Sequence, residues 1–250
     1  MSGVQLGVMR RRVFLAGTAA TASAGLAGCL NSVFGGSHGA TDDVVLDEPE
    51  LYDQMRASRD DGNLPHPIHA DELPDVTVPD ATGSGDISTH AYVGDRHLLL
   101  TFIFTRCTMV CPGLTASFAQ IQARAPSEGY EDEIAFMPMT FDPEYDTPEV
   151  LETYSEDMGA IPEDSNWHFL RPETPEEAAE IVNGEFGVNF WELSDEEREE
   201  LEMPDNMVYD HVSAIMLVNA DGYIERTYTG SRVPNAAGLL DDFETLRERW

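Results

Sequence analysis

Two cysteines, Cys107 and Cys111, are separated by three residues and follow the apolar segment 98–104. Thiolates at this spacing on a loop can close a disulfide or bind one soft metal ion. Pro112 suits the first turn of a helix, and a helix N-terminus favours the thiolate form of a nearby cysteine. The pattern therefore predicts a thiol site between a buried strand and a helix over about residues 113–124. An inert disulfide is the structural alternative, although a staple across so small a loop adds little stability.

A histidine 100 residues further along, His211, directly precedes a second predicted strand, 212–218. If that strand is a neighbour of the strand before the thiol loop, the imidazole can reach the two sulfurs. Two thiolates and one imidazole in a trigonal arrangement suit copper. The adjacent Asp210 could orient the ring from behind, as carboxylates often do for metal-binding histidines, although an exposed acid is an equal alternative.

Several other side chains carry groups that bind metals in some proteins. Met109 lies inside the thiol loop, where its thioether is a candidate copper ligand. Met137 and Met139 belong to an apolar segment, so we interpret them as core residues. His66 and His69 lie in a proline-containing segment without a third ligand, so we interpret them as ordinary surface residues.

The segments around the thiol loop alternate between strand and helix patterns. Such alternation, closed by a hairpin and a last helix, predicts an α/β protein with a central mixed β-sheet flanked by α-helices. This order of elements is thioredoxin-like. The predicted strands are 98–104, 134–140, 167–170, 212–218 and 223–228, with short strands around a turn at 81–85; the predicted helices cover about 46–59, 113–124, 194–202 and 237–249 and begin at 147 and 174.

The charge of the chain limits its partners. The 250 residues include 14 basic and 47 acidic side chains, a net charge of −33, and every basic residue is arginine. Such a surface repels nucleic acid, so no nucleic-acid partner is expected. The acids are spread over most of the chain rather than gathered in one patch. We interpret this as adaptation to high salt, where screening weakens the repulsion, and predict a halophilic source.

The N-terminal segment has the features of an export address. Arginines at 10–12 precede a short, weakly apolar stretch that ends in Leu-Ala-Gly-Cys at 26–29. This is typical of a twin-arginine signal over residues 1–28, with Cys29 as the residue that receives lipid. An ordinary cleaved signal with an incidental cysteine is the alternative. We expect a tether or linker with a short helix over 29–72 and one domain over 73–250, held on the outer face of the cell membrane.

Four motifs in the predicted domain occur together in a known family. They are Phe-Thr-Arg-Cys and Cys-Pro in residues 104–112, Phe-Asp-Pro-Glu-Tyr-Asp-Thr-Pro-Glu at 141–149, Asp-His at 210–211 and Asn-Ala-Asp-Gly at 219–222. In this order they resemble the Sco/SenC family, over roughly residues 73–250. The family consists of thioredoxin-like copper proteins that help to assemble the binuclear copper centre of cytochrome oxidase.

The resemblance implies that Cys107, Cys111 and His211 are copper ligands. It also implies delivery of copper to the copper-accepting subunit of a terminal oxidase, with another extracytoplasmic copper protein as a different recipient. The chain departs from the family in Thr108 and Met109, where proline and often aspartate follow the first cysteine. The acidic insert at 194–205 has no counterpart that we can assign.

Two other classes of function use the same residues. In a thiol–disulfide reductase, which would keep the cysteines of the copper-accepting subunit reduced, Cys107 and Cys111 are the redox pair and the histidine is dispensable. In a purely structural domain, the cysteines form an inert bridge and the histidine is a core residue. A peroxidase is weaker still, because no further acid or resolving thiol accompanies the pair.

Overall fold

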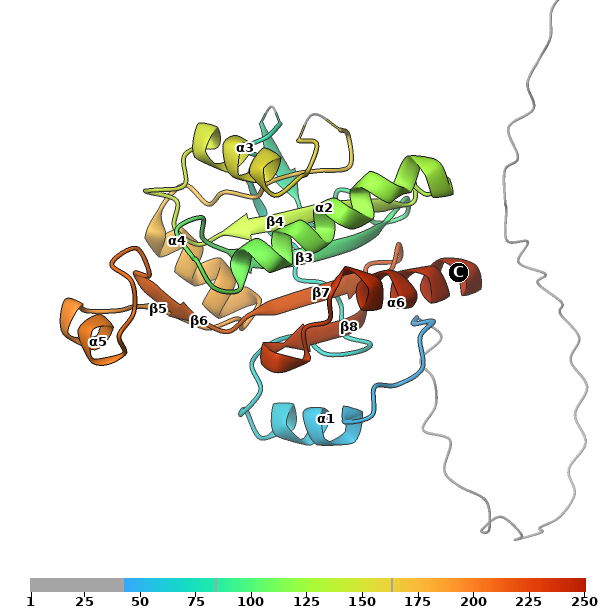
Figure 1. Ribbon diagram of the computed structural model, residues 1–250. Coiled ribbons are helices and arrows are strands. Elements are labelled where there is room, and N and C mark those ends of the chain that lie inside the picture. The colour runs from blue at the N-terminus through green and yellow to red at the C-terminus, as the bar shows by residue number, and fades with distance from the viewer. Residues whose placement is uncertain (1–42, 84, 163) are drawn as a thin grey trace, which may run out of the picture. The chain divides into compact units, whose positions relative to one another are not determined.

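A four-stranded sheet of order β4–β3–β7–β8 lies at the centre of the protein (Figure 1). The computed structural model describes residues 43–83, 85–162 and 164–250. The strands are β3 (His97–Ile103), β4 (Ile134–Thr140), β7 (Ala214–Val218) and β8 (Ile224–Thr229). β3 is parallel to β4 and antiparallel to β7, and β7 is antiparallel to β8, so the sheet is mixed as predicted. Every residue of β3, β4 and β7 is buried, which explains their continuous apolar sequences.

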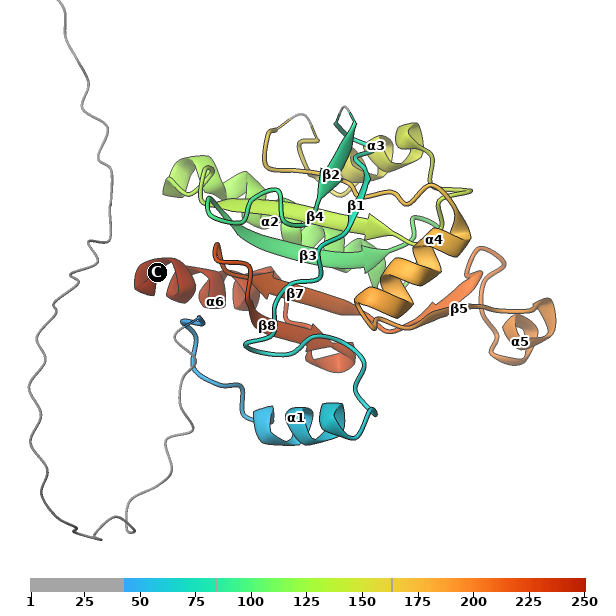
Figure 2. The same cartoon turned by 180° about the vertical axis from the view of Figure 1, so that it is seen from behind.

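Helices cover both faces of this sheet. α2 (Cys111–Glu128) and α6 (Ala236–Arg249) lie side by side over one face (Figure 1), and α4 (Pro175–Ala179) lies over the other, where it continues into a π-helical turn at Glu180–Glu185 (Figure 2). α2 is longer than predicted and ends at Gly129, whose φ of 74° is the left-handed conformation favoured by glycine. α6 buries an apolar stripe of residues, as predicted: Leu239, Leu240, Phe243 and Leu246.

Shorter elements border the sheet. β1 (Thr77–Pro79) and β2 (Asp86–Ser88) form the antiparallel pair predicted around the turn at 81–85. α3 (Pro148–Asp157) begins at the predicted N-cap, Thr147, whose hydroxyl accepts a hydrogen bond from the backbone of Val150. The predicted strand 167–170 is reduced to isolated bridges beside β4, and a single 3-10 turn (Gly230–Arg232) precedes α6.

A small hairpin next to the sheet was not predicted. β5 (Phe190–Glu192) pairs with β6 (Tyr209–His211), and α5 (Asp195–Glu200) lies on the connection between them (Figure 1). The expected single strand 212–218 is therefore wrong at its start, because His211 ends β6 and β7 begins at Ala214. α5 is the predicted acidic surface helix, with a reciprocal capping box between Ser194 and Glu197 and no buried residue.

The segment before β1 packs on the sheet edge instead of running free from residue 43 onward. Leu46 is buried, and the backbone N–H groups of Val45 and Leu46 donate to the carboxylate of Glu225 in β8. The helix predicted over 46–59 is shorter, α1 (Tyr52–Asp60), and buries no residue. Within the described part of the chain, no helix is long and apolar enough to cross a membrane. The twin-arginine segment and Cys29 lie outside the described residues, so that address and the domain boundaries stay predictions.

Candidate metal centre

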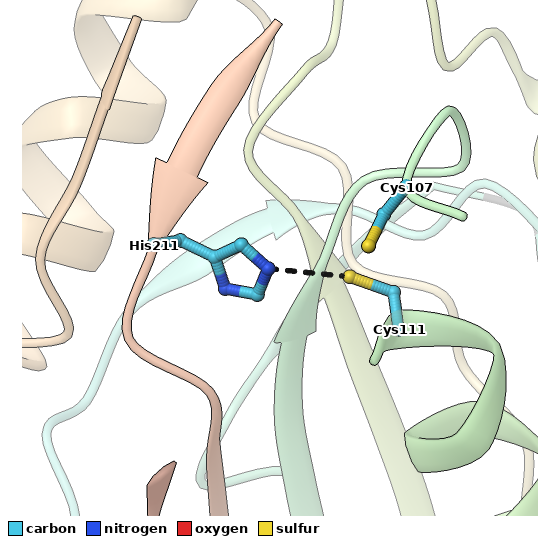
Figure 3. Close-up of side chains that lie close together, drawn as sticks. All are labelled: Cys107, Cys111 and His211. Atoms are coloured by element: carbon cyan, nitrogen blue, oxygen red, sulfur yellow. Dashed lines mark hydrogen bonds between the residues drawn. The ribbon is translucent and has the colours of Figure 1, made fainter. Parts of the chain in front are cut away.

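Three side chains from three different elements converge at one end of the sheet (Figure 3). Cys107 lies on the loop that follows β3, Cys111 is the first residue of α2, and His211 is the last residue of β6. Their Sγ and ring-nitrogen atoms all lie within 4.8 Å of one another, and Cys111 Sγ is 3.5 Å from His211 Nε2. The prediction that the histidine reaches the thiol loop is confirmed as geometry, although it does so from β6 rather than from the sheet strand.

The spacing of these atoms suits a single metal ion. Bonds of about 2.0 to 2.3 Å from nitrogen and sulfur, as zinc makes, place ligand atoms roughly 3.5 to 4 Å apart around one ion. Both cysteines are free thiols; Cys107 is 2% exposed and Cys111 is fully buried. Met109, on the loop between the two cysteines, is 67% exposed. The group therefore consists of two soft sulfurs and one imidazole, a donor set that suits copper(I) and also zinc.

The imidazole is oriented by aromatic packing rather than by a carboxylate. The ring of His211 packs against Phe104 and Phe141, with centroids 5.8 and 5.2 Å away. Asp210 Oδ1 accepts a hydrogen bond from the backbone N–H of His211, so the expected contact between this carboxylate and the ring is not made. Within the described residues, the buried Nδ1 of the ring has no hydrogen-bond partner, and Nε2 points at the sulfurs.

The two thiols have very different acidities. The hydrogen bond from Cys111, with smaller contributions from His211 and nearby backbone N–H groups, lowers the pKa of Cys107 to about 4. Burial and the neighbouring thiolate raise the pKa of Cys111 well above its ordinary value. The two shifts have opposite directions, so they favour the thiolate at Cys107 and the thiol at Cys111. A soft metal ion would displace the proton of that thiol, and a disulfide partner would meet Cys107 as the nucleophile.

A buried carboxylate fixes the start of the thiol loop. Asp146 accepts hydrogen bonds from the backbone N–H of Thr105 at 3.2 Å and from the hydroxyls of Thr105 and Thr140. It is fully buried, and burial raises its pKa even though these bonds favour the charged form. The sequence placed Asp146 in a motif but assigned it no role. Its position between Tyr145 and Thr147 gives no signal that it reaches back 41 residues to the loop.

A second carboxylate holds the side chain next to Cys107. Arg106 donates from Nε and from its terminal nitrogen to Asp142 Oδ2, at 2.9 and 2.5 Å, and its guanidinium lies 4.4 Å from the ring centroid of Tyr145. Burial raises the pKa of Asp142 to about 6, and the guanidinium offsets only part of that rise. The ion pair ties the thiol loop to the segment that follows β4.

The remaining candidates lie away from this centre. Met137 and Met139 are fully buried in β4, where they are core residues as predicted. The interpretation of His66 and His69 as surface residues is wrong. Both are buried, and their Nδ1 atoms hydrogen-bond to the carbonyl oxygens of Pro67 and Glu225. The ring of His69 thus bonds to the backbone of β8 and that of His66 to its own segment, and among the described residues neither belongs to a group of three or more His, Cys, Asp or Glu side chains that could hold a metal ion.

Comparison with known proteins agrees with the motifs. Residues 81–246 match the model of the SCO1/SenC family. The chain belongs to this family. A SCO1 protein homolog of Bacillus subtilis (strain 168) is 26% identical over 132 residues, which are 53% of this chain and 61% of that relative. The matched part of the chain thus spans about three fifths of that SCO1 homolog.

Solved structures of Sco proteins have the same fold. BsSco, described as a member of the Sco family of cytochrome c oxidase assembly proteins with a disulfide switch, matches with a TM-score of 0.53 and 23% identity, covering 72% of this chain and 95% of that one. Copper-bound ScoI of Bradyrhizobium japonicum matches with a TM-score of 0.54 and 18% identity, covering 70% and 99%. The thioredoxin-like fold predicted from the element order is confirmed.

Proposed function

We propose that this protein binds copper through Cys107, Cys111 and His211 and delivers it to the binuclear copper site of a cytochrome c oxidase-type terminal oxidase. The observation that carries the proposal is the convergence of these three ligand atoms within 4.8 Å from a loop, a helix start and a hairpin. Membership of the SCO1/SenC family and the likeness to a copper-bound ScoI support copper as the ion.

The chemistry of the site favours transfer over permanent storage. A partner thiolate can replace one ligand at a time, because two thiolates and an imidazole leave a coordination position open to a fourth group. The thiols must be reduced, so oxidation of the pair to a disulfide abolishes binding. The lowered pKa of Cys107 favours its thiolate, so the proton that an arriving ion displaces would come from Cys111.

The cellular setting follows from the sequence. Lipid attached to Cys29 would hold the domain at the outer face of the membrane, after export by the twin-arginine route. The recipient would be an oxidase subunit with extracytoplasmic copper ligands, and another extracytoplasmic copper protein is the alternative. Labelling of Cys29 by a lipid precursor, abolished in Cys29→Ser, tests the anchor.

X-ray absorption of the copper(I)-loaded protein tests the ligand set. The expected spectrum contains two sulfur scatterers and one nitrogen scatterer. His211→Ala should lose the nitrogen contribution, while His90→Ala, a histidine bonded to the carbonyl of Leu73, should keep it. An unchanged spectrum in His211→Ala means that the three-ligand centre is wrong.

Delivery needs its own test. The copper-loaded protein is mixed with a purified copper-binding domain of an oxidase subunit, and the absorption of the binuclear centre is followed. Formation of that centre supports delivery. If copper binds tightly but never reaches the domain, the oxidase is not the recipient.

A thiol–disulfide reductase is the second candidate, and the split in acidity of the two thiols favours it. Cys107, with its pKa lowered to about 4, would attack a disulfide, and Cys111 would resolve the mixed disulfide. Two electrons pass from the dithiol to the substrate, leaving a Cys107–Cys111 disulfide. Metal-free His211→Ala should then reduce an oxidised copper-site domain as fast as the parent protein. Failure of both proteins to reduce it removes this candidate.

A further inference from the structure

Neither thiol of the centre is open to solvent, although the loop between them is exposed. Cys107 is 2% exposed and Cys111 is fully buried, whereas Thr108 and Met109 lie on the surface. A metal ion, a partner thiol or a disulfide must contact sulfur in order to react. Access to the pair therefore requires movement of the loop 105–110, and whatever fastens this loop controls the rate of access.

Two consecutive residues fasten the loop from outside. Asn206 donates from Nδ2 to the carbonyl oxygen of Arg106 at 2.7 Å. The backbone N–H of Thr108 donates to the sulfur of Met207 at 3.4 Å, and Met207 is 3% exposed. These contacts flank Cys107 on both sides in sequence, so they hold the stretch that must move.

The segment that carries these two residues is the connection between β5 and β6. Near its end it packs on the core through the buried Met207 and the partly buried Met203 and Val208, whereas α5, earlier in the same connection, buries no residue. Glu202 in the same connection has a φ of 52°, a conformation that side chains other than glycine rarely adopt. Segments with few buried contacts open locally at low free energy, without unfolding of the core.

There is also room for the loop to move. An open cavity of about 620 Å³ lies against the loop on the side of α3. Thr105, Arg106, Thr108 and Asn206 line it on one side, and Tyr145 and residues along the length of α3 line the other. The loop is therefore bounded by its contacts with Asn206 and Met207 and by empty space.

We propose that Asn206 and Met207 form a clasp that positions the thiol loop over the two cysteines, and that opening of this clasp admits the reacting partner. The clasp acts through the loop, so both are positioning residues. The inference concerns access to the thiols and holds for copper transfer and for disulfide exchange alike. Its failure would leave the proposed copper site untouched.

The test measures alkylation of the reduced, metal-free full chain by iodoacetamide, with mass spectrometry to assign each cysteine. Asn206→Asp keeps the shape of the side chain and removes its donor, and Met207→Leu keeps the volume and removes the sulfur acceptor. Loss of one hydrogen bond of ordinary net strength should raise the opening equilibrium, and with it the alkylation rate of Cys107, about fivefold.

The same segment supplies matched controls. Asp205→Asn changes an exposed acid next to the clasp, and Met203→Leu changes a half-buried methionine four residues earlier. Both controls should alkylate at the parent rate. Equal rates in all five proteins, or an equal acceleration in the controls, would overturn the clasp.

A second measurement needs no variant and distinguishes the clasp from a general loosening of the fold. Thr108 is exposed, yet its N–H is bonded to Met207, so its amide should exchange with solvent markedly more slowly than an unbonded surface amide. In Met207→Leu, protection should be lost at Thr108 and kept in the core strands. An unprotected Thr108 amide in the parent protein would contradict the clasp.

Discussion

A fully buried carboxylate, Glu225, fastens the N-terminal segment to the edge of the sheet. Its two oxygens accept hydrogen bonds from the backbone N–H of Val45 at 2.9 and 3.1 Å, from Leu46 at 2.8 Å and from Asn219 Nδ2 at 2.7 Å. Glu225→Gln replaces one oxygen by an NH₂ group. Whichever oxygen is replaced, the new donor faces two other donors.

The expected loss of stability follows from the hydrogen bonds that Glu225→Gln removes. Hydrogen bonds to a charged group contribute about 1.5 to 3 kcal/mol each, and the substitution removes two of them. The segment before β1 can relieve the clash between donors by detaching from the sheet. The loss of stability is therefore limited to the free energy with which this segment binds the sheet, including the burial of Leu46. We therefore expect Glu225→Gln to lower the free energy of unfolding by about 2 to 4 kcal/mol.

Chemical denaturation and amide hydrogen exchange measure this effect together, in high salt. The amides of Val45 and Leu46 should lose their protection in Glu225→Gln. Glu248→Gln removes the same charge from an exposed site on α6 and should change stability by less than about 0.5 kcal/mol. A Glu225→Gln protein within 0.5 kcal/mol of the parent (roughly the surface-substitution range), with both amides still protected, would refute the reasoning.

Three further outcomes are expected. Copper(I) affinity should rise about tenfold per pH unit above neutrality, because binding releases the proton of Cys111; a competition titration with a flat pH profile would contradict this. Burial raises the pKa of Asp142 to about 6, so the stabilisation from its protonated form is complete below about pH 4 and is lost as pH rises through 6. The difference in free energy of unfolding between the parent and Asp142→Asn, measured by denaturation, should therefore shift by about 2 to 3 kcal/mol over that range. Phe118→Ala removes a fully buried ring that packs against Phe136 and should destabilise the protein by about 3 to 5 kcal/mol; a loss below 1 kcal/mol, about that of a mild core truncation, would mean that this core is loosely packed.

The sequence predicts the sheet well because its strands are buried on both faces. Ile134–Thr140 is apolar up to its last residue, and its predicted bounds are the observed ones, and the turn at 219–222 carries the residues that a tight connection needs. The hairpin of β5 and β6 escaped prediction because each strand has only three residues and sixteen residues lie between them. A pattern so short has no periodicity to detect.

In the site, too, the sequence predicts the residues that carry a recognisable pattern and misses those that do not. The two cysteines and His211 were predicted from residue type and motif, which record the chemistry of a ligand directly. The groups that hold the loop could not be found in this way. Asp146 and Met207 act through contacts 41 and 99 residues distant in sequence, and ordinary acids and methionines look the same whether or not they make such contacts. Burial of His66 and His69 likewise depends on the docked N-terminal segment.

The central claim is that one copper ion is held by three residues. Its most direct test is a copper(I) competition titration of the reduced protein in high salt, beside Cys107→Ser, Cys111→Ser, His211→Ala and the control His90→Ala. We expect tight one-to-one binding in the parent and in the control, and a collapse of affinity in each of the other three variants. Weak binding in the parent, or binding that is indifferent to His211→Ala, would contradict it.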